Sequence, residues 1–256
     1  MSKYTFTESN YEQAIIELFR DQLGYEYIYG PDIERDYAEP LFLERLQQSL
    51  LAINPSLPEV AIHEAIEKIR QIDTGSLVQR NEVFTDYLQN GVDVAYFDGK
   101  EQCATCVRLI DYEQPKLNNF VVANQWSIEE HSVRRADIIV FINGFPLVVM
   151  ELKSPSRTET NVSEAYAQLR NYMQEIPSLF VYNAFCVMSD LVTSKAGTIT
   201  SGEDRFMEWK TVDGQAEDNH FANFHVLFCG MFEHERLIEI IRDFICFSKD
   251  EKQSAK

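Results

Sequence analysis

The order of apolar patterns along this chain of 256 residues predicts an α/β or α+β fold, with one central mixed sheet flanked by helices. Three observations support this prediction. A helical pattern opens the chain, alternating strand patterns occupy its middle, and helical and strand patterns alternate after that. Hydrophobic residues make up 45% of the sequence, which is typical of globular proteins and sufficient for a large core.

The N-terminal segment is expected to form a helix followed by a short strand. Residues 8–24 carry apolar side chains at helical spacing. Ser9 or Asn10 is the candidate N-cap, and Gly24 is the candidate stop signal. The short aromatic segment 25–29 is then expected to be extended.

A helical insertion is expected after the first helix, at about residues 40–89. Two helical patterns lie within 40–72, and a third covers 77–89. No polar linker flanks these patterns, so we interpret them as part of a single domain covering residues 1–247. The polar tail 248–256 is typical of the start of an interdomain linker.

The rest of the chain mixes strand and helix patterns. Strands are predicted before a hairpin at residues 134–153, at 92–97, 105–111 and 119–123, and after it, at 185–189 and 225–229. Helices are predicted at 162–176, where Pro177 terminates the pattern, and at 237–247. Residues 155–161 are expected to form a polar loop.

The central hairpin, at residues 134–153, contains the most informative pattern. Two β-rich apolar runs are joined at Asn143-Gly144, which is the strongest short-range hairpin signal. Asp137 opens the first run, and Glu151 and Lys153 close the second. Residues two apart on a strand point to the same face, so Glu151 and Lys153 are expected to project side by side.

These charges suit metal-dependent phosphodiester chemistry. Two carboxylates can hold Mg²⁺, which prefers a few oxygen ligands plus water and phosphate, and the Leu152 carbonyl is a candidate third ligand. The metal would activate water, which Lys153 would orient or help to deprotonate. A bare Glu-x-Lys triplet is more often a pair of solvated charges, but the upstream Asp137 and the long apolar runs favour a nuclease centre.

The register of the hairpin decides whether the two carboxylates meet. With a two-residue turn in perfect register, Asp137 would pair with Met150 and face away from Glu151. A loop of odd length or one β-bulge would bring Asp137 onto the Glu151 face. The sequence therefore predicts a register irregularity in this hairpin.

The spacing of Asp137, Glu151 and Lys153 in this hairpin resembles that of the PD-(D/E)xK nuclease superfamily. Residues 135–155 look like the nuclease domain of the restriction (R) subunit of type I restriction–modification enzymes. The resemblance also covers residues 7–12, 23–25, 168–172, 197–200 and 205–210. Ala136 stands where the superfamily name has proline, at a position that varies. The resemblance implies a PD-(D/E)xK core in which Asp137 and Glu151 hold Mg²⁺ and act with Lys153 in catalysis.

The same resemblance implies supporting residues outside the hairpin. Gln168 and Tyr172 share a helix face and match a Gln-x-x-x-Tyr motif of the type I subunits. They could bond DNA phosphate or orient active-site groups; otherwise Tyr172 packs in the core and Gln168 is merely exposed. Glu12 matches a helix-borne glutamate that completes the metal site in related nucleases, although the helix dipole also favours a glutamate near a helix N-terminus.

The net charge of −18 contrasts with the basic surface of a free-standing DNA-binding protein. Either DNA is not the substrate, or other subunits hold the DNA and this chain needs only a local basic rim. Four arginines near the site in sequence could form such a rim, or could simply solvate loop ends: Arg134, Arg135, Arg157 and Arg170. Arg135 is the candidate DNA contact among them.

The resemblance also implies cofactors and partners. In this family an ATP-driven helicase motor follows the nuclease domain, so residues 248–256 would lead into it. ATP would bind the full-length subunit rather than this segment, which has no Gly-x-x-x-x-Gly-Lys-Ser/Thr motif. The expected partners are double-stranded DNA and the methyltransferase and specificity subunits. A cytoplasmic location without a membrane is expected, because the chain has neither a signal sequence nor a long apolar run.

The expected activity is cleavage of unmodified foreign DNA after translocation by the motor, and two other classes remain open. A non-catalytic docking module on the same fold would need neither Lys153 nor the metal. A stand-alone repair or junction nuclease would need a homodimer and a basic face, against which the net charge of −18 argues.

Overall fold

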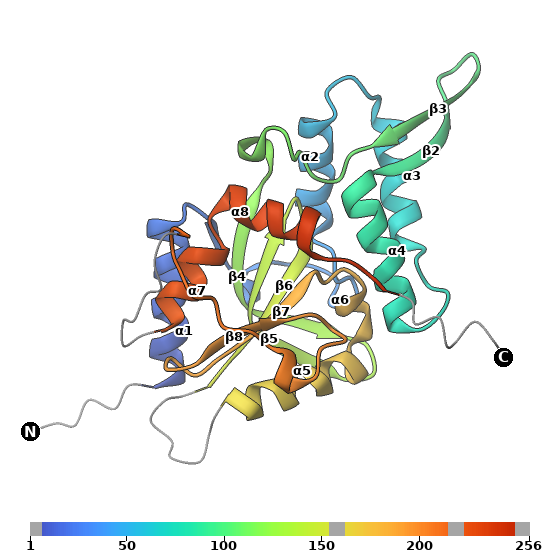
Figure 1. The fold of residues 1–256 in the computed structure, drawn as a ribbon. Helices are drawn as coiled ribbons and strands as arrows, with labels where there is room; N and C mark the ends of the chain where they lie inside the picture. The colour runs from blue at the N-terminus through green and yellow to red at the C-terminus, as the bar shows by residue number, and fades with distance from the viewer. Residues whose placement is uncertain (1–6, 154–161, 215–222, 249–256) are drawn as a thin grey trace, which may run out of the picture.

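A mixed six-stranded sheet lies at the centre of the computed structural model, which describes residues 7–153, 162–214 and 223–248 (Figure 1). In sheet order the strands are β1 (Glu26–Tyr29), β4 (Phe120–Glu129), β5 (Val133–Ile142), β6 (Phe145–Leu152), β7 (Phe185–Ser189) and β8 (Ser194–Gly197). β1 is parallel to β4 and β6 to β7, whereas the other neighbours are antiparallel. The predicted fold class, a central mixed sheet flanked by helices as in PD-(D/E)xK nucleases, is confirmed.

Helices cover both faces of this sheet, because its central strands are apolar on both sides. One face packs against α1 (Glu8–Glu17), α7 (Asn223–Met231) and α8 (His234–Glu239). The opposite face packs against α5 (Val162–Glu175) and α6 (Pro177–Val181). Within the described segments, none of the helices combines the length and the apolar character that crossing a bilayer requires.

The predicted helical insertion consists of α2 (Leu43–Ile53), α3 (Glu59–Arg70) and α4 (Leu77–Asn90). It continues into β2 (Val92–Phe97) and β3 (Gln102–Val107), which pair only with each other and form a ribbon that extends beyond the helices in Figure 1. Both strands were predicted from the sequence, which did not indicate that they lie outside the central sheet. An alternating pattern indicates one buried face, here packed in the core together with α3, but it does not say which sheet a strand joins.

Several local predictions were also wrong. The N-cap of α1 is Thr7, which forms a capping box with Asn10, rather than Ser9 or Asn10 itself. Residues 225–229 lie within helix α7 and are not a strand, because a short, mostly apolar run fits a buried helix as well as a strand. β8 was not predicted, since it lacks apolar alternation. The expected loop at 155–161 and all but the first residue of the tail 248–256 lie outside the described residues.

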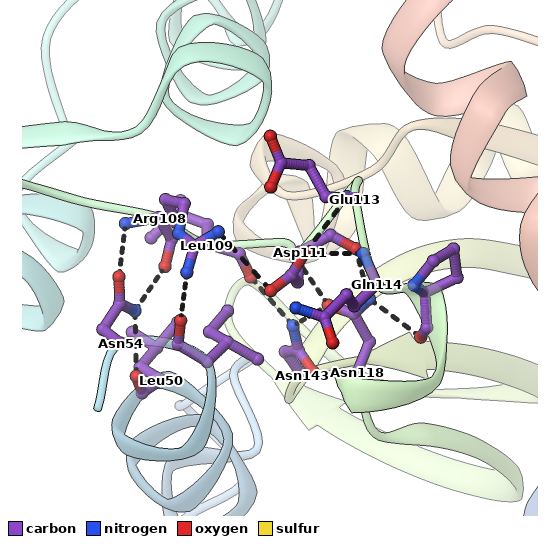
Figure 2. A network of polar contacts seen from close by, with 11 residues as sticks. Leu50, Asn54, Arg108, Leu109, Asp111, Glu113, Gln114, Asn118 and Asn143 are labelled. Atoms are coloured by element: carbon purple, nitrogen blue, oxygen red, sulfur yellow. Dashed lines mark hydrogen bonds and ion pairs between the residues drawn. The ribbon is translucent and has the colours of Figure 1, made fainter. Parts of the chain in front are cut away.

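A buried polar network anchors the turn of the central hairpin (Figure 2). Asn143 is fully buried, with a φ of 52°, and its Oδ1 accepts a hydrogen bond from Asn119 N at 2.7 Å. Its Nδ2 donates to Leu109 O at 2.9 Å and to Asn118 Oδ1 at 2.8 Å. Figure 2 shows this network beside a second one, in which Asn54 at the end of α2 bonds the backbone of Arg108. Asn143 bonds the next residue, Leu109, so the turn is attached to the segment that follows β3.

Candidate active site

The hairpin of β5 and β6 contains the predicted register irregularity. The partner of Phe141 is Pro146, whereas the partner of Val140 is Val148, which leaves Leu147 as the extra residue of a β-bulge. The prediction is therefore confirmed. The Leu147 carbonyl does not remain unpaired, because the backbone N of Ala184 donates to it at 2.7 Å.

The bulge brings Asp137 onto the face of Glu151. The β5–β6 pairing ends with Ile138 and Met150, and the same register places Asp137 opposite Glu151. Directly opposed residues of antiparallel strands share a face. Asp137 Oδ2 also accepts a hydrogen bond from Leu152 N at 2.8 Å. The two carboxylates that the sequence singled out therefore lie together at the end of the hairpin.

Glu151 and Lys153 form a buried ion pair. The exposed fraction is 1% for Glu151 and 8% for Lys153, and Lys153 Nζ lies 2.6 Å from Glu151 Oε1. The other oxygen, Glu151 Oε2, is buried and has no hydrogen-bond partner among the described residues. A buried carboxylate oxygen without a partner is costly, so this atom marks a place where a further positive group would be favourable.

The pKa values of the charged groups also favour an additional positive group at this site. Burial raises the pKa of Asp137 to about 6. Burial, followed by the charge of Asp137, raises the pKa of Glu151 well above its usual range. Burial acts to lower the pKa of Lys153, but the charges of Glu151 and Asp137 outweigh it and the pKa is raised. Lys153 therefore keeps its proton, and additional positive charge would favour the ionised form of both carboxylates.

Helix α5 supplies a second partner for Lys153. Lys153 Nζ donates to Gln168 Oε1 at 3.0 Å, and Gln168 Nε2 donates to Tyr172 OH at 2.6 Å. Tyr172 OH in turn donates to the backbone carbonyl of Arg135 at 3.1 Å. Tyr172 is buried and Gln168 is partly exposed, and these hydrogen bonds connect the pair to the ammonium group of Lys153.

Glu12, on α1, lines a cavity that Asp137 and Lys153 also line. This cavity has a volume of about 1360 Å³ and is lined by residues of α5 as well. Both oxygens of Glu12 are held there, Oε1 by Asn124 Nδ2 at 2.6 Å and Oε2 by Gln125 Nε2 at 2.9 Å. These two amides were not predicted to belong to the site. Their only signal was that they interrupt the apolar run of β4.

The four arginines near the site differ in their surroundings. Arg134 forms an ion pair with Glu175, with Nη2 2.6 Å from Oε1. Arg170 donates to a backbone carbonyl on the α5 side of the sheet. Arg135 is exposed, lines the cavity and has no ion-pair partner among the described residues. Arg157 lies outside the described residues.

The donor atoms suit a hard divalent cation that keeps part of its water. In the part of the chain that the structure describes, no three His, Cys, Asp or Glu side chains form a ready-made metal-binding group. Mg²⁺ does not need one, because it commonly binds through one or two carboxylates and completes its shell with water and substrate phosphate. Asp137 and Glu151 meet that requirement, and the unpaired Glu151 Oε2 is the observation that favours it.

Comparison with known proteins agrees with the resemblance inferred from the residues. A family model described as the type I restriction enzyme R protein N terminus matches residues 5–205, which include the hairpin and the Gln168–Tyr172 pair. The chain belongs to this family. Its R-protein relatives include the type I restriction enzyme HindI endonuclease subunit of Haemophilus influenzae, which is 36% identical over 95% of the chain.

Other relatives are more distant. The MjaIXP endonuclease subunit of Methanocaldococcus jannaschii is 31% identical over 93% of the chain. The SauMSSORF170P endonuclease subunit of Staphylococcus aureus is 28% identical over 68% of the chain. The chain spans only 24% and 25% of the length of the Haemophilus and Methanocaldococcus relatives.

Proposed function

We propose that this chain is the nuclease region of a type I restriction enzyme R subunit and hydrolyses phosphodiester bonds of unmodified double-stranded DNA with Mg²⁺. The observation that carries the proposal is the group formed by Asp137 and the buried Glu151–Lys153 ion pair, with the unpaired Glu151 Oε2, beside a large cavity. The family to which the chain belongs, and the names of its relatives as endonuclease subunits, support the same proposal.

Each residue of the group has a distinct role in this proposal. Asp137 and Glu151 would hold the cation, because Lys153 occupies Oε1 of Glu151 and leaves Oε2 free. When bound, Mg²⁺ would lower the pKa of a water molecule and stabilise negative charge on the phosphate. Lys153 would orient that water and place a positive charge near the scissile phosphate. Gln168 and Tyr172 would keep the ammonium group in position.

The rest of the R subunit and its partners would supply what this region lacks. An ATP-driven motor would move the DNA, ATP would bind there, and methyltransferase and specificity subunits would select unmodified DNA in the cytoplasm. A net charge of −18 suits a region that receives DNA already held by other parts of the complex. The two alternatives, a docking module and a stand-alone nuclease, have no specific observation in their favour.

Two measurements together test the proposal. Calorimetry should show that the wild-type chain binds Mn²⁺ or Mg²⁺, that Asp137→Ala and Glu151→Ala do not, and that Glu164→Ala, an exposed carboxylate of the same cavity, does. A complex reconstituted with full-length R subunit carrying Lys153→Ala should hydrolyse ATP but not cut DNA. Cleavage at the wild-type rate by that complex would remove the catalytic proposal and leave the docking module.

A further inference from the structure

Two neighbouring amides of β4 fix the direction of the Glu12 carboxylate. Asn124 Nδ2 and Gln125 Nε2 bond its two oxygens separately, at 2.6 Å and 2.9 Å. The Asn124 amide is itself oriented, because Tyr27 OH donates to its Oδ1 at 3.1 Å. A carboxylate held at both oxygens has little rotational freedom, and this one is held at the wall of the cavity.

A regular strand could not make this contact. Successive side chains of a strand point to opposite faces, so Asn124 and Gln125 should not reach the same carboxylate. The backbone at Gln125 has a φ of 53°, in the left-handed region that residues other than glycine rarely adopt. The pairing of β4 with β5 skips Gln125, which stands opposite Asp137, and resumes at Trp126. The kink therefore lies directly across from the candidate metal ligand.

The packing of β4 records the same change of face. Before the kink, Val122 belongs to the core on the α1 side of the sheet. After it, Trp126 and Ile128, which are also even-numbered, belong to the core on the α5 side. The alternation has thus shifted by one residue at Gln125. Such a strained position persists only when its surroundings hold it, and strained positions cluster at functional sites.

Gly30 is part of what holds it. A Cβ atom at Gly30 would lie 2.8 Å from the carbonyl oxygens of both Asn124 and Gln125, closer than real Cβ contacts. The chain after β1 therefore packs directly against the kinked backbone. Glu12, Asn124, Gln125 and Asp137 all line the same cavity, so the clamped carboxylate and the candidate metal ligand border the same space.

We propose that Asn124 and Gln125 are positioning residues that hold Glu12 toward the cation site of Asp137 and Glu151. The role of Glu12 at that site rests on the proposed function, whereas the amide clamp is a property of the chain itself. If the contact served only to attach α1 to β4, its loss would change stability but would not act on cation affinity through Glu12. Amide hydrogen exchange and Mn²⁺ affinity separate these two cases.

The first experiment tests the clamp without any cation. NMR hydrogen exchange of the side-chain amides is measured in the wild-type chain and in Glu12→Ala. The Asn124 and Gln125 amides should exchange at least about tenfold faster in the variant, since they lose a charge-assisted hydrogen bond. The Gln13 amide, which bonds Glu17 at 3.0 Å on the exposed side of the same helix, is the internal control and should not change. Unaltered exchange at Asn124 and Gln125 would overturn the proposal.

The second experiment tests positioning by a double-mutant cycle on Mn²⁺ affinity. Asn124→Ala and Gln125→Gly should each weaken binding by about 10- to 100-fold, as is usual for partners that orient a ligand. In a Glu12→Ala background neither change should weaken it further. Gln125→Gly keeps the kink, because glycine accepts a positive φ, so its unfolding temperature should not fall. Gln13→Ala is the matched control and should bind Mn²⁺ as the wild type does.

The outcomes are distinct. Losses of affinity that add to that of Glu12→Ala would show that the amides do not act through Glu12 and would overturn the proposal. Failure of the wild-type chain to bind Mn²⁺ would overturn the metal centre of the proposed function, and with it this role of Glu12. The amide exchange would still show in that case whether the clamp exists.

Discussion

Among the described residues, Lys153 Nζ bonds one charged oxygen and one neutral oxygen, and the neutral one offers the sharper test of how the ammonium group is positioned. Gln168→Ala removes the acceptor at 3.0 Å without changing any charge. We expect the maximal rate of DNA cleavage by the reconstituted complex to fall by about 10- to 100-fold, with DNA affinity little changed, because orientation rather than binding is lost. Single-turnover cleavage at saturating ATP measures this, and Asn171→Ala, an exposed amide of the same cavity wall, is the control.

Tyr172→Phe should have a smaller effect in the same assay. The phenol oxygen accepts from Gln168 Nε2 and donates to the Arg135 carbonyl, so its loss loosens the amide but leaves Gln168 able to reach Lys153. A Gln168→Ala complex that cuts at the wild-type rate while binding DNA more weakly would contradict the positioning role. It would favour the alternative in which this pair bonds DNA phosphate.

Asp137 is expected to lower the stability of the chain at neutral pH. Its pKa is raised from 3.8 to about 6, first because of burial. Below pH 3.8 the carboxyl group is protonated in both folded and unfolded chains, so it imposes no penalty; the penalty grows as the pH rises toward 6 and is complete above it. The shift of about two units corresponds to at most about 3 kcal/mol.

Asp137→Asn should therefore raise the unfolding temperature at pH 8, and raise it less at pH 5. The amide oxygen can still accept the hydrogen bond from Leu152 N. Thermal unfolding followed by circular dichroism at both pH values is the measurement, with Glu164→Gln as a control that removes an exposed carboxylate from the same cavity. Equal stabilisation by Asp137→Asn at both pH values would contradict a raised pKa.

At the scale of elements, the register of the hairpin depends on its buried turn as well as on its bulge. Asn143→Ala removes two donated hydrogen bonds and one accepted one, and it leaves Leu109 O and Asn119 N without that partner. Each buried group left unpaired costs about 1–3 kcal/mol, and alanine also tolerates a positive φ poorly. We expect a loss of about 3–5 kcal/mol in the free energy of unfolding.

Urea denaturation measures that loss, and Asn90→Ala is the matched control. Asn90 donates to Asp86 within an exposed turn of α4, so its substitution should cost less than about 1 kcal/mol. If both variants lost the same small amount, the network of Figure 2 would contribute little to the hairpin.

The hairpin also shows how far the sequence alone could lead. Asn143-Gly144 predicts the turn, and the need for Asp137 and Glu151 to share a face predicts an irregularity. The position of the bulge could not be predicted, because Leu147 differs from its apolar neighbours only in the long-range bond that its carbonyl accepts from Ala184.

Other features lie beyond local patterns for related reasons. Residues 225–229 are a short, mostly apolar run, and whether such a run becomes a strand or a helix depends on the core against which it packs. The kink at Gln125 has no sequence signal, because a glutamine does not by itself indicate a positive φ. The ribbon of β2 and β3 shows an alternating pattern that fits either sheet.

At the scale of the whole molecule, the cavity is more acidic than a DNA-binding surface should be. It is lined by Glu8, Glu12, Asp137, Glu164 and Glu175 against Arg134, Arg135 and Lys153. Arg134 is already paired with Glu175, and Lys153 with Glu151. Among the described lining residues Arg135 is thus the cation left to meet a phosphate, and a bound divalent cation would add most of the remaining attraction.

The chain by itself should therefore bind duplex DNA only when a divalent cation is present. Without one, we expect affinity weaker than the roughly 1–100 µM typical of non-specific binding, because the net charge of −18 opposes the approach of phosphate. Ca²⁺ also seeks carboxylate oxygens, and it should strengthen binding by wild type but not by Asp137→Ala. Fluorescence anisotropy over a salt series with a short labelled duplex is the measurement.

Arg135→Ala should weaken the cation-dependent binding and reduce the salt slope by about one. Lys116→Ala, which removes an exposed lysine before β4 and outside the cavity lining, is the control and should leave that slope unchanged. Tight, cation-independent binding by the wild-type chain would contradict this account, because an acidic cavity could then not be where DNA is held. The attraction would have to come from another surface, and the role assigned to Arg135 would pass to that surface.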